Sequence, residues 1–355
     1  MKDKKKNEET TAKKTVSVEE DQAMDNIHKS IYDVMEQEIS NSDIPDKEKT
    51  KRLSNLLRMR NMKVNILVTG ATGVGKSSTI NALFNTEVAK VGVGVDPETT
   101  LIEKYELDNL TIWDTPGLGD NVKTDKAIKR QMIRKMNETD DNGEALIDLV
   151  LVLVDASSKD LGTSFGVIND ILVPCLGKDA EKRIIVALNQ ADVAMKGKHW
   201  DAEKNEPDKV LQDYLERKAL SVKERILEAT GLKITPIYFC AGYTEEDEEN
   251  IVRHPYNLTK LLYHIVQAIP KEKRLALIDN VSTDDENWIH DDQKTDYKKK
   301  TAESFFESVG ECIGEGMEAG SEIGEELLGI PGMLLGGVLG AVTGAIKGIC
   351  KELFS

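Results

Sequence analysis

Short apolar runs alternate along the chain with longer stretches in which apolar residues recur at helical spacing. The runs are rich in branched residues and are bounded by Gly or polar residues, which is typical of buried strands. The predicted strands are residues 64–68, 101–107, 110–113, 149–154, 184–188 and 234–239. The predicted helices that separate most of them are residues 76–85, 123–137, 163–172, 207–229 and 257–267.

This alternation predicts an α/β fold for the centre of the chain. Strands that are apolar throughout are typical of a mainly parallel sheet covered by helices on both faces. Residues 101–107 and 110–113 are so close in sequence that we expect them to form an antiparallel hairpin.

The flanks of this α/β domain, which we place at residues 61–270, have other patterns. Residues 1–22 are charged and lack apolar periodicity, which predicts a disordered tail. Residues 23–60 show two helical patterns, which predict a helical arm packed on the main domain. Residues 271–301 are polar and charged, and we expect a linker or a loosely packed extension there. Residues 302–355 form a separate C-terminal segment.

Composition narrows the classes of partner and the compartment. The chain has 355 residues, 39% of them hydrophobic, and a formal net charge of -16. Such a surface repels phosphate backbones, so generic nucleic-acid binding is not expected. The cysteines form no CxxC pair, and the first 14 residues contain no apolar stretch of the kind a signal peptide needs. Both observations predict a cytoplasmic protein with reduced thiols.

The first chemical motif follows the predicted strand 64–68 directly and precedes the predicted helix 76–85. It matches G-x-x-x-x-G-K-[ST], whose backbone N–H groups cradle phosphates at a helix N-terminus. Lys76 would reach the β and γ phosphates, and the Ser77 hydroxyl would ligate Mg²⁺. The predicted phosphate-binding residues are Gly70, Ala71, Thr72, Gly73, Val74, Gly75, Lys76, Ser77 and Ser78.

Two further elements complete the phosphate and metal site. Asp114 emerges at the end of the predicted strand 110–113, where a carboxylate can hold Mg²⁺ through water, and the Gly117 N–H can then sense the γ-phosphate. The loop between the two motifs ends in two hydroxyls, and one of them would complete the Mg²⁺ shell. We favour Thr100, with Thr99 as the alternative. The predicted catalytic residues are thus Lys76, Thr100 and Gly117, and the predicted metal ligands are Ser77, Thr100 and Asp114.

Selection of the base is predicted for residues 189–192, which follow the strand 184–188. The Asp192 carboxylate can accept from guanine N1–H and N2–H₂, which adenine cannot supply, and Asn189 would tie this loop back to the phosphate loop. The turn around Ala241 could offer a backbone N–H to guanine O6. A protein that uses ATP would require a merely structural Asp192, so GTP is the expected ligand.

The ordered set of motifs resembles the TRAFAC-class, Era-like GTPases. The stretches GATGVGKSSTINALF, AKVGVGVDPETT, IWDTPGLGD and LNQAD together resemble a bacterial, often prophage-linked branch of predicted GTPases. The resemblance covers roughly residues 60–270. It implies the P-loop NTPase G-domain fold, GTP or GDP as ligand and Mg²⁺ as cofactor.

Three positions depart from the pattern of these GTPases. Gln190 stands where the family usually has a Lys whose stem lies against guanine, so we expect weaker nucleotide binding with unchanged specificity. Leu118 stands where Ras-like proteins place the Gln that orients the attacking water. Gly73 stands where potassium-activated relatives carry Asn. Slow turnover, near the ~10⁻⁴ to 10⁻³ s⁻¹ of unassisted small GTPases, is therefore expected unless an activator or dimer partner contributes.

The C-terminal segment combines an acidic face with a glycine stripe. Glutamates recur near every fourth residue from Glu303 to Glu326, and glycines recur every fourth residue from Gly332 to Gly348. Residues 327–346 contain no charge, which is about the length that crosses a bilayer as a helix. One interpretation is membrane association, and the other is packing of this glycine-zipper helix against the acidic helix or a sister chain. The leading function is a GTP-dependent switch. The alternative is a dynamin-like protein whose G domain gates membrane association or self-assembly.

Overall fold

The computed structural model describes residues 30–86, 90–92, 102–119, 122–244 and 252–313. Several predictions made from the sequence lie outside these residues. They are the disordered tail, the start of the helical arm, both candidate switch threonines Thr99 and Thr100, and the glycine stripe of the C-terminal segment.

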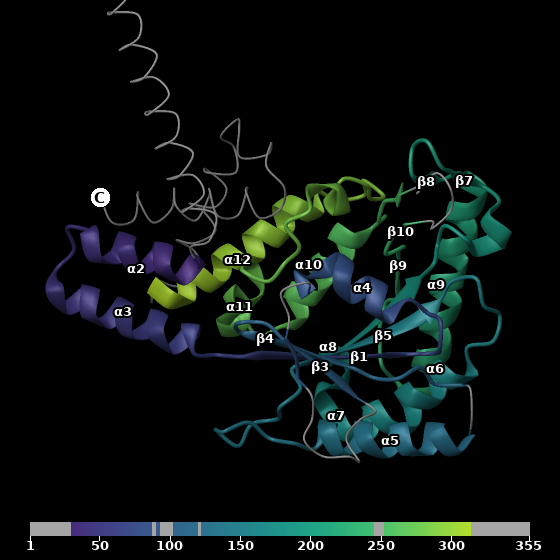
Figure 1. The fold of residues 1–355 in the computed structure, drawn as a ribbon, viewed down its shortest axis with the longest axis horizontal. Coiled ribbons are helices and arrows are strands. Elements are labelled where there is room, and N and C mark those ends of the chain that lie inside the picture. The colour runs from purple at the N-terminus through teal and green to yellow at the C-terminus, as the bar shows by residue number, and fades with distance from the viewer. Residues whose placement is uncertain (1–29, 87–89, 93–101, 120–121, 245–251, 314–355) are drawn as a thin grey trace, which may run out of the picture.

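Among the described residues, a seven-stranded sheet forms the centre of the molecule (Figure 1), with the strand order β2-β3-β4-β1-β5-β6-β9. Strands β4, β1, β5, β6 and β9 run parallel, whereas β2, β3 and β4 are joined antiparallel. The predicted mainly parallel sheet and its hairpin are thus confirmed. The strands are β1 (Val64–Gly70), β2 (Lys90–Gly92), β3 (Glu103–Glu106), β4 (Leu110–Asp114), β5 (Leu149–Asp155), β6 (Ile184–Asn189) and β9 (Ile237–Tyr238).

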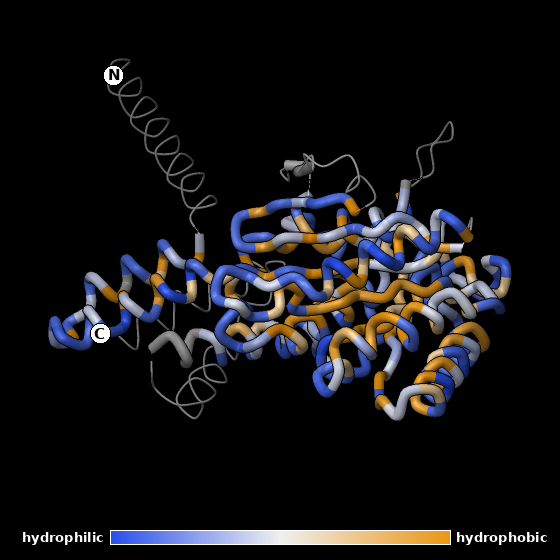
Figure 2. Tube along the Cα trace, turned by 90° about the horizontal axis from the view of Figure 1, so that it is seen from below, coloured by the Kyte–Doolittle hydropathy of each residue, from blue (hydrophilic) through white to orange (hydrophobic). Residues whose placement is uncertain are grey.

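Helices cover both faces of this sheet, and the hydrophobic strands run between them (Figure 2). Both faces of the sheet are apolar, because alternate side chains of a strand point to opposite faces. In β1, Ile66 and Val68 belong to one buried cluster, and Leu67 belongs to the other. The first face is covered by α2 (Ile31–Asn41), α3 (Asp46–Arg60), α4 (Lys76–Leu83), α10 (Leu258–Ala268), α11 (Leu275–Ile278) and α12 (Tyr297–Ile313). The second face is covered by α5 (Val122–Met136), α6 (Gly162–Val167), α7 (Val173–Leu176), α8 (Ala180–Arg183) and α9 (Lys209–Thr230).

Shorter elements connect these helices and strands. A π-helical turn, Ile168–Leu172, joins α6 to α7. Two small hairpins pair β7 (Trp200–Asp201) with β8 (Glu206–Pro207) and β10 (Tyr243–Thr244) with β11 (Val252–Arg253). Within the described ranges, 3₁₀ turns are formed by Gly177–Asp179, Ala194–Gly197, Lys271–Lys273 and Asp285–Trp288, among others.

The helical arm, α2 and α3, lies beside α12 on the first face (Figure 1). Its start is held by a residue almost 250 positions away in sequence: the Asp279 carboxylate accepts hydrogen bonds from the Ser30 hydroxyl at 2.5 Å and from the Ile31 N–H at 3.0 Å. The second bond satisfies one of the N–H groups that a helix N-terminus leaves unpaired. The arm therefore shares the core of the main domain.

The segment that we predicted as a polar linker is packed into the same core. Leu275, Leu277 and Ile278 are buried in α11, and Trp288 is 1% exposed, with its indole N–H donating to the Ser282 carbonyl at 3.0 Å. Charged residues surround these apolar ones in the sequence. The composition of residues 271–301, taken as a whole, is therefore polar and gave no sign of the buried side chains. The expected loose extension is thus a tightly packed part of the structure.

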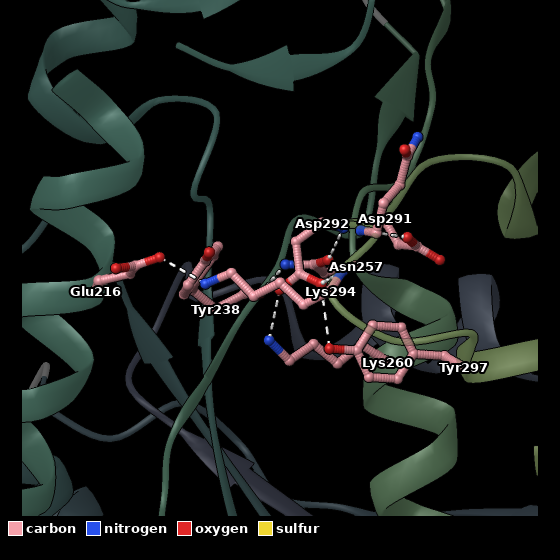
Figure 3. A network of polar contacts seen from close by, with 9 residues as sticks. Glu216, Tyr238, Asn257, Lys260, Asp291, Asp292, Lys294 and Tyr297 are labelled. Atoms are coloured by element: carbon pink, nitrogen blue, oxygen red, sulfur yellow. Dashed lines mark hydrogen bonds and ion pairs between the residues drawn. The ribbon is translucent and has the colours of Figure 1, made fainter. Parts of the chain in front are cut away.

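A polar network holds the end of this segment (Figure 3). The side chain of Asp292 has no exposed surface, and its carboxylate accepts from Lys260 Nζ at 2.7 Å and from the Tyr297 hydroxyl at 3.1 Å. The Asp292 N–H donates to Asn257 Oδ1, and Asn257 Nδ2 donates to the Tyr238 carbonyl. The network connects α12 and α10 to the end of β9, three residues before Ala241.

Within the described part of the chain, no helix combines the length and the apolar composition that crossing a membrane requires.

Candidate nucleotide-binding site

Residues from four parts of the sequence meet at one edge of the sheet. The phosphate loop leaves β1 after Gly70, Asp114 is the last residue of β4, and Asn189 is the last residue of β6. Ala241 follows β9 by three residues. All four strands are parallel, so their carboxyl ends share this edge, where open α/β sheets bind ligands. The described residues that we predicted for phosphate, metal and base binding therefore lie in one region.

The phosphate loop has the backbone that only glycine adopts readily. Gly73 and Gly75 have φ angles of 75° and 84°, in the left-handed region. A Cβ atom at Gly75 would collide with the side-chain amide of Asn189, and one at Gly70 would lie 2.5 Å from the Leu153 carbonyl oxygen. Helix α4 begins at Lys76, so its unpaired N–H groups and positive end face the loop. This geometry is suited to an anionic phosphate chain.

The described oxygen atoms fit a divalent cation. The Ser77 hydroxyl donates to Asp114 Oδ2 at 3.3 Å, and Asp114 Oδ1 is buried without a hydrogen-bond partner in the described structure. Burial raises the pKa of Asp114 to about 6, while the positive charge of Lys76 opposes the shift. A buried, unpartnered carboxylate oxygen is costly by itself, and hard cations such as Mg²⁺ prefer oxygen ligands. Ser77 and Asp114 would therefore hold Mg²⁺.

Asn189 joins the base-binding loop to the phosphate loop. Its Nδ2 donates to the Val74 carbonyl at 2.8 Å, and its Oδ1 accepts from the Ala241 N–H at 3.1 Å. The side chain is nearly fully buried, so both bonds are protected from water. The Ala241 N–H, which we had considered as a donor to guanine O6, is engaged by Asn189 in this structure.

Gln190 makes a second connection between the same loops. It has a φ angle of 63°, in the left-handed region, and its Nε2 donates to the Gly73 carbonyl at 2.9 Å. The amide thus reaches the phosphate loop from the position of the family's Lys. Two residues on, burial raises the pKa of Asp192, while the backbone N–H groups of Asp192 and Val193 and the nearby positive charge of Arg253 oppose the shift. A partly buried carboxylate of this kind is stabilised by N–H donors, which guanine supplies.

The segment after Asp114 pairs directly with the phosphate loop, a feature that sequence reasoning missed. The Thr72 N–H donates to the Leu118 carbonyl at 3.1 Å, and the Leu118 N–H donates to the Gly70 carbonyl at 3.2 Å. The Leu118 side chain is 1% exposed and belongs to the core cluster on the second face. Leu118 is therefore a buried anchor as well as a replacement for a water-orienting Gln. The sequence did contain a signal for this burial: Leu118 is an apolar residue that follows Gly117 directly and lies outside every predicted helix.

A family model, curated proteins and solved structures are similar to parts of this chain. Residues 65–190 match the family model described as 50S ribosome-binding GTPase. The GTPase HflX of Flavobacterium psychrophilum is 28% identical over 240 residues, which cover 65% of this chain and 54% of the relative. Cell division control protein 10 of Saccharomyces cerevisiae is 33% identical over 92 residues, which cover 22% of this chain and 29% of the relative.

The chain thus spans about a third to a half of the length of these curated relatives. A solved structure of a probable GTP-binding protein engB is 18% identical and is matched over 58% of this chain and 98% of its own, with a TM-score of 0.36. The fold class predicted from the motifs is confirmed: the central domain is a P-loop GTPase G domain, with a mostly parallel sheet flanked by helices.

Proposed function

We propose that this protein binds Mg²⁺–GTP through residues 70–78, Asp114 and residues 189–192, hydrolyses it slowly, and acts as a switch. The observation that carries the proposal is the position of Asn189. Its two side-chain hydrogen bonds hold the phosphate loop and the Ala241 turn together, and Asn189 stands three residues before Asp192 in the sequence. A single rigid arrangement would thus read both the phosphates and the base.

Each residue has a chemical role in this proposal. Lys76 would hold the β and γ phosphates, and Ser77 and Asp114, together with Thr100, would hold Mg²⁺, which neutralises charge on the phosphates. The Gly117 N–H would bind the γ-phosphate. The Leu118 side chain has no group that can hydrogen-bond a water molecule, and it is buried, so slow intrinsic turnover is expected. The order of the motifs supports a place among Era-like GTPases.

The test is nucleotide binding and phosphate release, measured with GTP and with ATP. We expect Mg²⁺-dependent GTP binding, with much weaker binding of ATP. Lys76→Ala should abolish tight GTP binding because the phosphates lose their cation, whereas Lys47→Ala on the exposed face of α3 should not. Micromolar GTP affinity retained by Lys76→Ala would overturn the site assignment.

Asp192→Asn tests base selection separately. An amide cannot accept from both guanine N–H groups, but it can donate to the 2-carbonyl of xanthine. We expect the preference to move from GTP towards xanthosine triphosphate by about tenfold or more, the effect of about 1.4 kcal/mol. An unchanged preference would mean that Asp192 does not read the base.

Self-assembly is the alternative role, and the acidic and glycine-rich sequence of residues 302–355 is the observation that favours it. Turnover that rises with protein concentration or with anionic vesicles would support assembly gating. Turnover that stays slow and flat would favour a switch that requires a separate activator.

A further inference from the structure

Helix α5 is strongly basic in a chain that is acidic overall. Of its 15 residues six are Lys or Arg, and Asp125 alone is acidic, in a protein with a formal net charge of -16. The Asp125 carboxylate accepts from the Gly119 N–H at 3.1 Å, so the first turn of the helix is tied to the segment that follows Asp114. The charge is therefore concentrated on one element next to the nucleotide site.

The cations lie on the outer face of α5. Ile128, Met132 and Met136 face the core, and α5 lies at the lower edge of the molecule in Figure 1. Lys126, Arg130 and Arg134, four residues apart, are exposed on the opposite side, and among the described residues none of the three forms an ion pair. We call this surface, with its exposed Ile133, the α5 basic face.

The chain itself contains a segment of complementary charge. Residues 315–326 lie outside the described residues, and their sequence contains five glutamates and no Lys or Arg. Glu318, Glu322 and Glu326 are four residues apart, the same spacing as the three cations of α5. Residues at this spacing lie on one face of a helix, so three ion pairs could form between two helices at once.

We propose that the α5 basic face docks residues 315–326 of a second copy of this chain. The second copy is favoured because α12 ends at Ile313 on the first face of the sheet, whereas α5 covers the second face. A second copy can therefore present its acidic segment to α5 without the chain having to pass from one face of the sheet to the other.

A protein partner fits this surface better than a phosphate polymer. Ile133, which lies among the cations, is 41% exposed, and apolar area of this kind is buried in the centre of protein interfaces. The net charge of -16 repels a second copy and a phosphate polymer alike, so the choice rests on this exposed apolar side chain and on the matching spacing of the charges. This interface goes beyond the proposed GTP switch and does not require it.

The experiment is sedimentation velocity of the full chain over a micromolar concentration series, at low and high salt. Wild type should self-associate, more weakly at high salt. The triple variant Lys126→Glu, Arg130→Glu, Arg134→Glu should weaken association by about tenfold or more, the loss of about 1.4 kcal/mol. The matched control is Lys47→Glu, Lys51→Glu, Arg58→Glu, which makes the same charge change on exposed positions of α3.

A charge swap keeps the proposal testable if one variant behaves poorly. The triple variant Glu318→Lys, Glu322→Lys, Glu326→Lys should also lose self-association. Mixed with the α5 variant, it should form a heterodimer, because each basic surface then meets an acidic one. Association that is equal in the α5 and α3 variants, a mixture that stays monomeric, or a wild type that is monomeric at micromolar concentrations would overturn the proposal.

Nucleotide affinity and binding to RNA or vesicles, measured on the same variants, distinguish this interface from the proposed function and from other partners. GDP and GTP affinity should be unchanged in the α5 variant, so a protein that binds no nucleotide refutes the proposed function and leaves the interface testable. If the α5 variant loses binding to single-stranded RNA or to anionic vesicles while self-association stays as in wild type, the surface serves that other partner and the proposal is wrong.

Discussion

The Leu118 carbonyl accepts a hydrogen bond from the Thr72 N–H at 3.1 Å, so the segment expected to sense the γ-phosphate lies directly on the phosphate loop. The reciprocal bond from the Leu118 N–H to the Gly70 carbonyl makes this a short parallel bridge. Because the Leu118 side chain is buried in the core, movement of this segment requires an apolar side chain to shift. If nucleotide binding moves this segment, core packing has to change with it.

Gly117→Ala should separate this segment from the phosphate loop. A Cβ at position 117 would lie 2.5 Å from Thr72 Cα, and backbone at that distance cannot give way by a simple side-chain rotation. We expect faster amide hydrogen exchange at Leu118 and Thr72 in the nucleotide-free protein, by about tenfold for each 1.4 kcal/mol lost. Gly166→Ala is the control, because its Cβ would meet only Asp170 Oδ2, at an ordinary 3.7 Å. Equal exchange in both variants would contradict the bridge.

Asn189→Ala should both destabilise the fold and weaken nucleotide binding. The substitution leaves the Val74 carbonyl and the Ala241 N–H without their buried partner, at a cost of about 1–3 kcal/mol for each group. Urea unfolding measures the stability change, and nucleotide titration measures the affinity. Asn137→Ala is the matched control, because its side chain is exposed and bonds only to a carbonyl of its own helix. An Asn189→Ala protein as stable as this control would refute the role as a bridge.

His264 should make stability depend on pH. It lines a cavity of about 770 Å³ between α10 and the starts of β6 and β9. Burial, with smaller effects of the positive Lys260 and Lys300, lowers the pKa of His264 to about 4 from an ordinary 6.5. The neutral form is therefore favoured in the folded state, and its stabilising contribution is present above pH 6.5 and is lost as pH falls towards 4.

The lost stability between these pH values approaches about 3 kcal/mol, because each pKa unit corresponds to 1.36 kcal/mol. His264→Gln, which cannot take up this proton, should lose less unfolding free energy than wild type between pH 7 and pH 4.5. The comparison with wild type is needed because Asp114 and Asp192, with raised pKa values, change stability in the opposite sense. Parallel pH profiles of the two proteins would show that His264 does not titrate as described.

Asp292→Ala should be strongly destabilising. The substitution leaves the Lys260 ammonium partly buried without its partner at 2.7 Å, and breaking such a pair costs about 3–5 kcal/mol. Urea unfolding of this variant, compared with Asp285→Ala at an exposed position, measures the effect. A loss below 1 kcal/mol, of the order of an exposed pair, would mean that the network in Figure 3 contributes little to stability.

Local patterns were sufficient to predict most of the G domain. The helix Val122–Met136 lies within one residue of its predicted bounds, because its 3.6-residue apolar period can be read from neighbouring residues. Strand β9 is shorter than predicted, at Ile237–Tyr238. As an edge strand it extends only as far as it pairs with its one neighbour, β6. The packed segment around Trp288 was missed because its few apolar residues are buried only by contacts with helices far away in sequence.

The sequence by itself determined the order of the strands and helices along the chain, and it predicted which motifs bind phosphate, metal and base, because these depend on residue types at short, constant spacing. Only the tertiary structure decided that Asn189 bridges Val74 and Ala241, and that Asp279 caps the arm at Ile31. It alone showed that Leu118 is buried against the core. Such contacts join residues about 50 to 250 positions apart. Which buried polar groups become hydrogen-bond partners therefore depends on how the elements pack, and local sequence patterns do not contain that information.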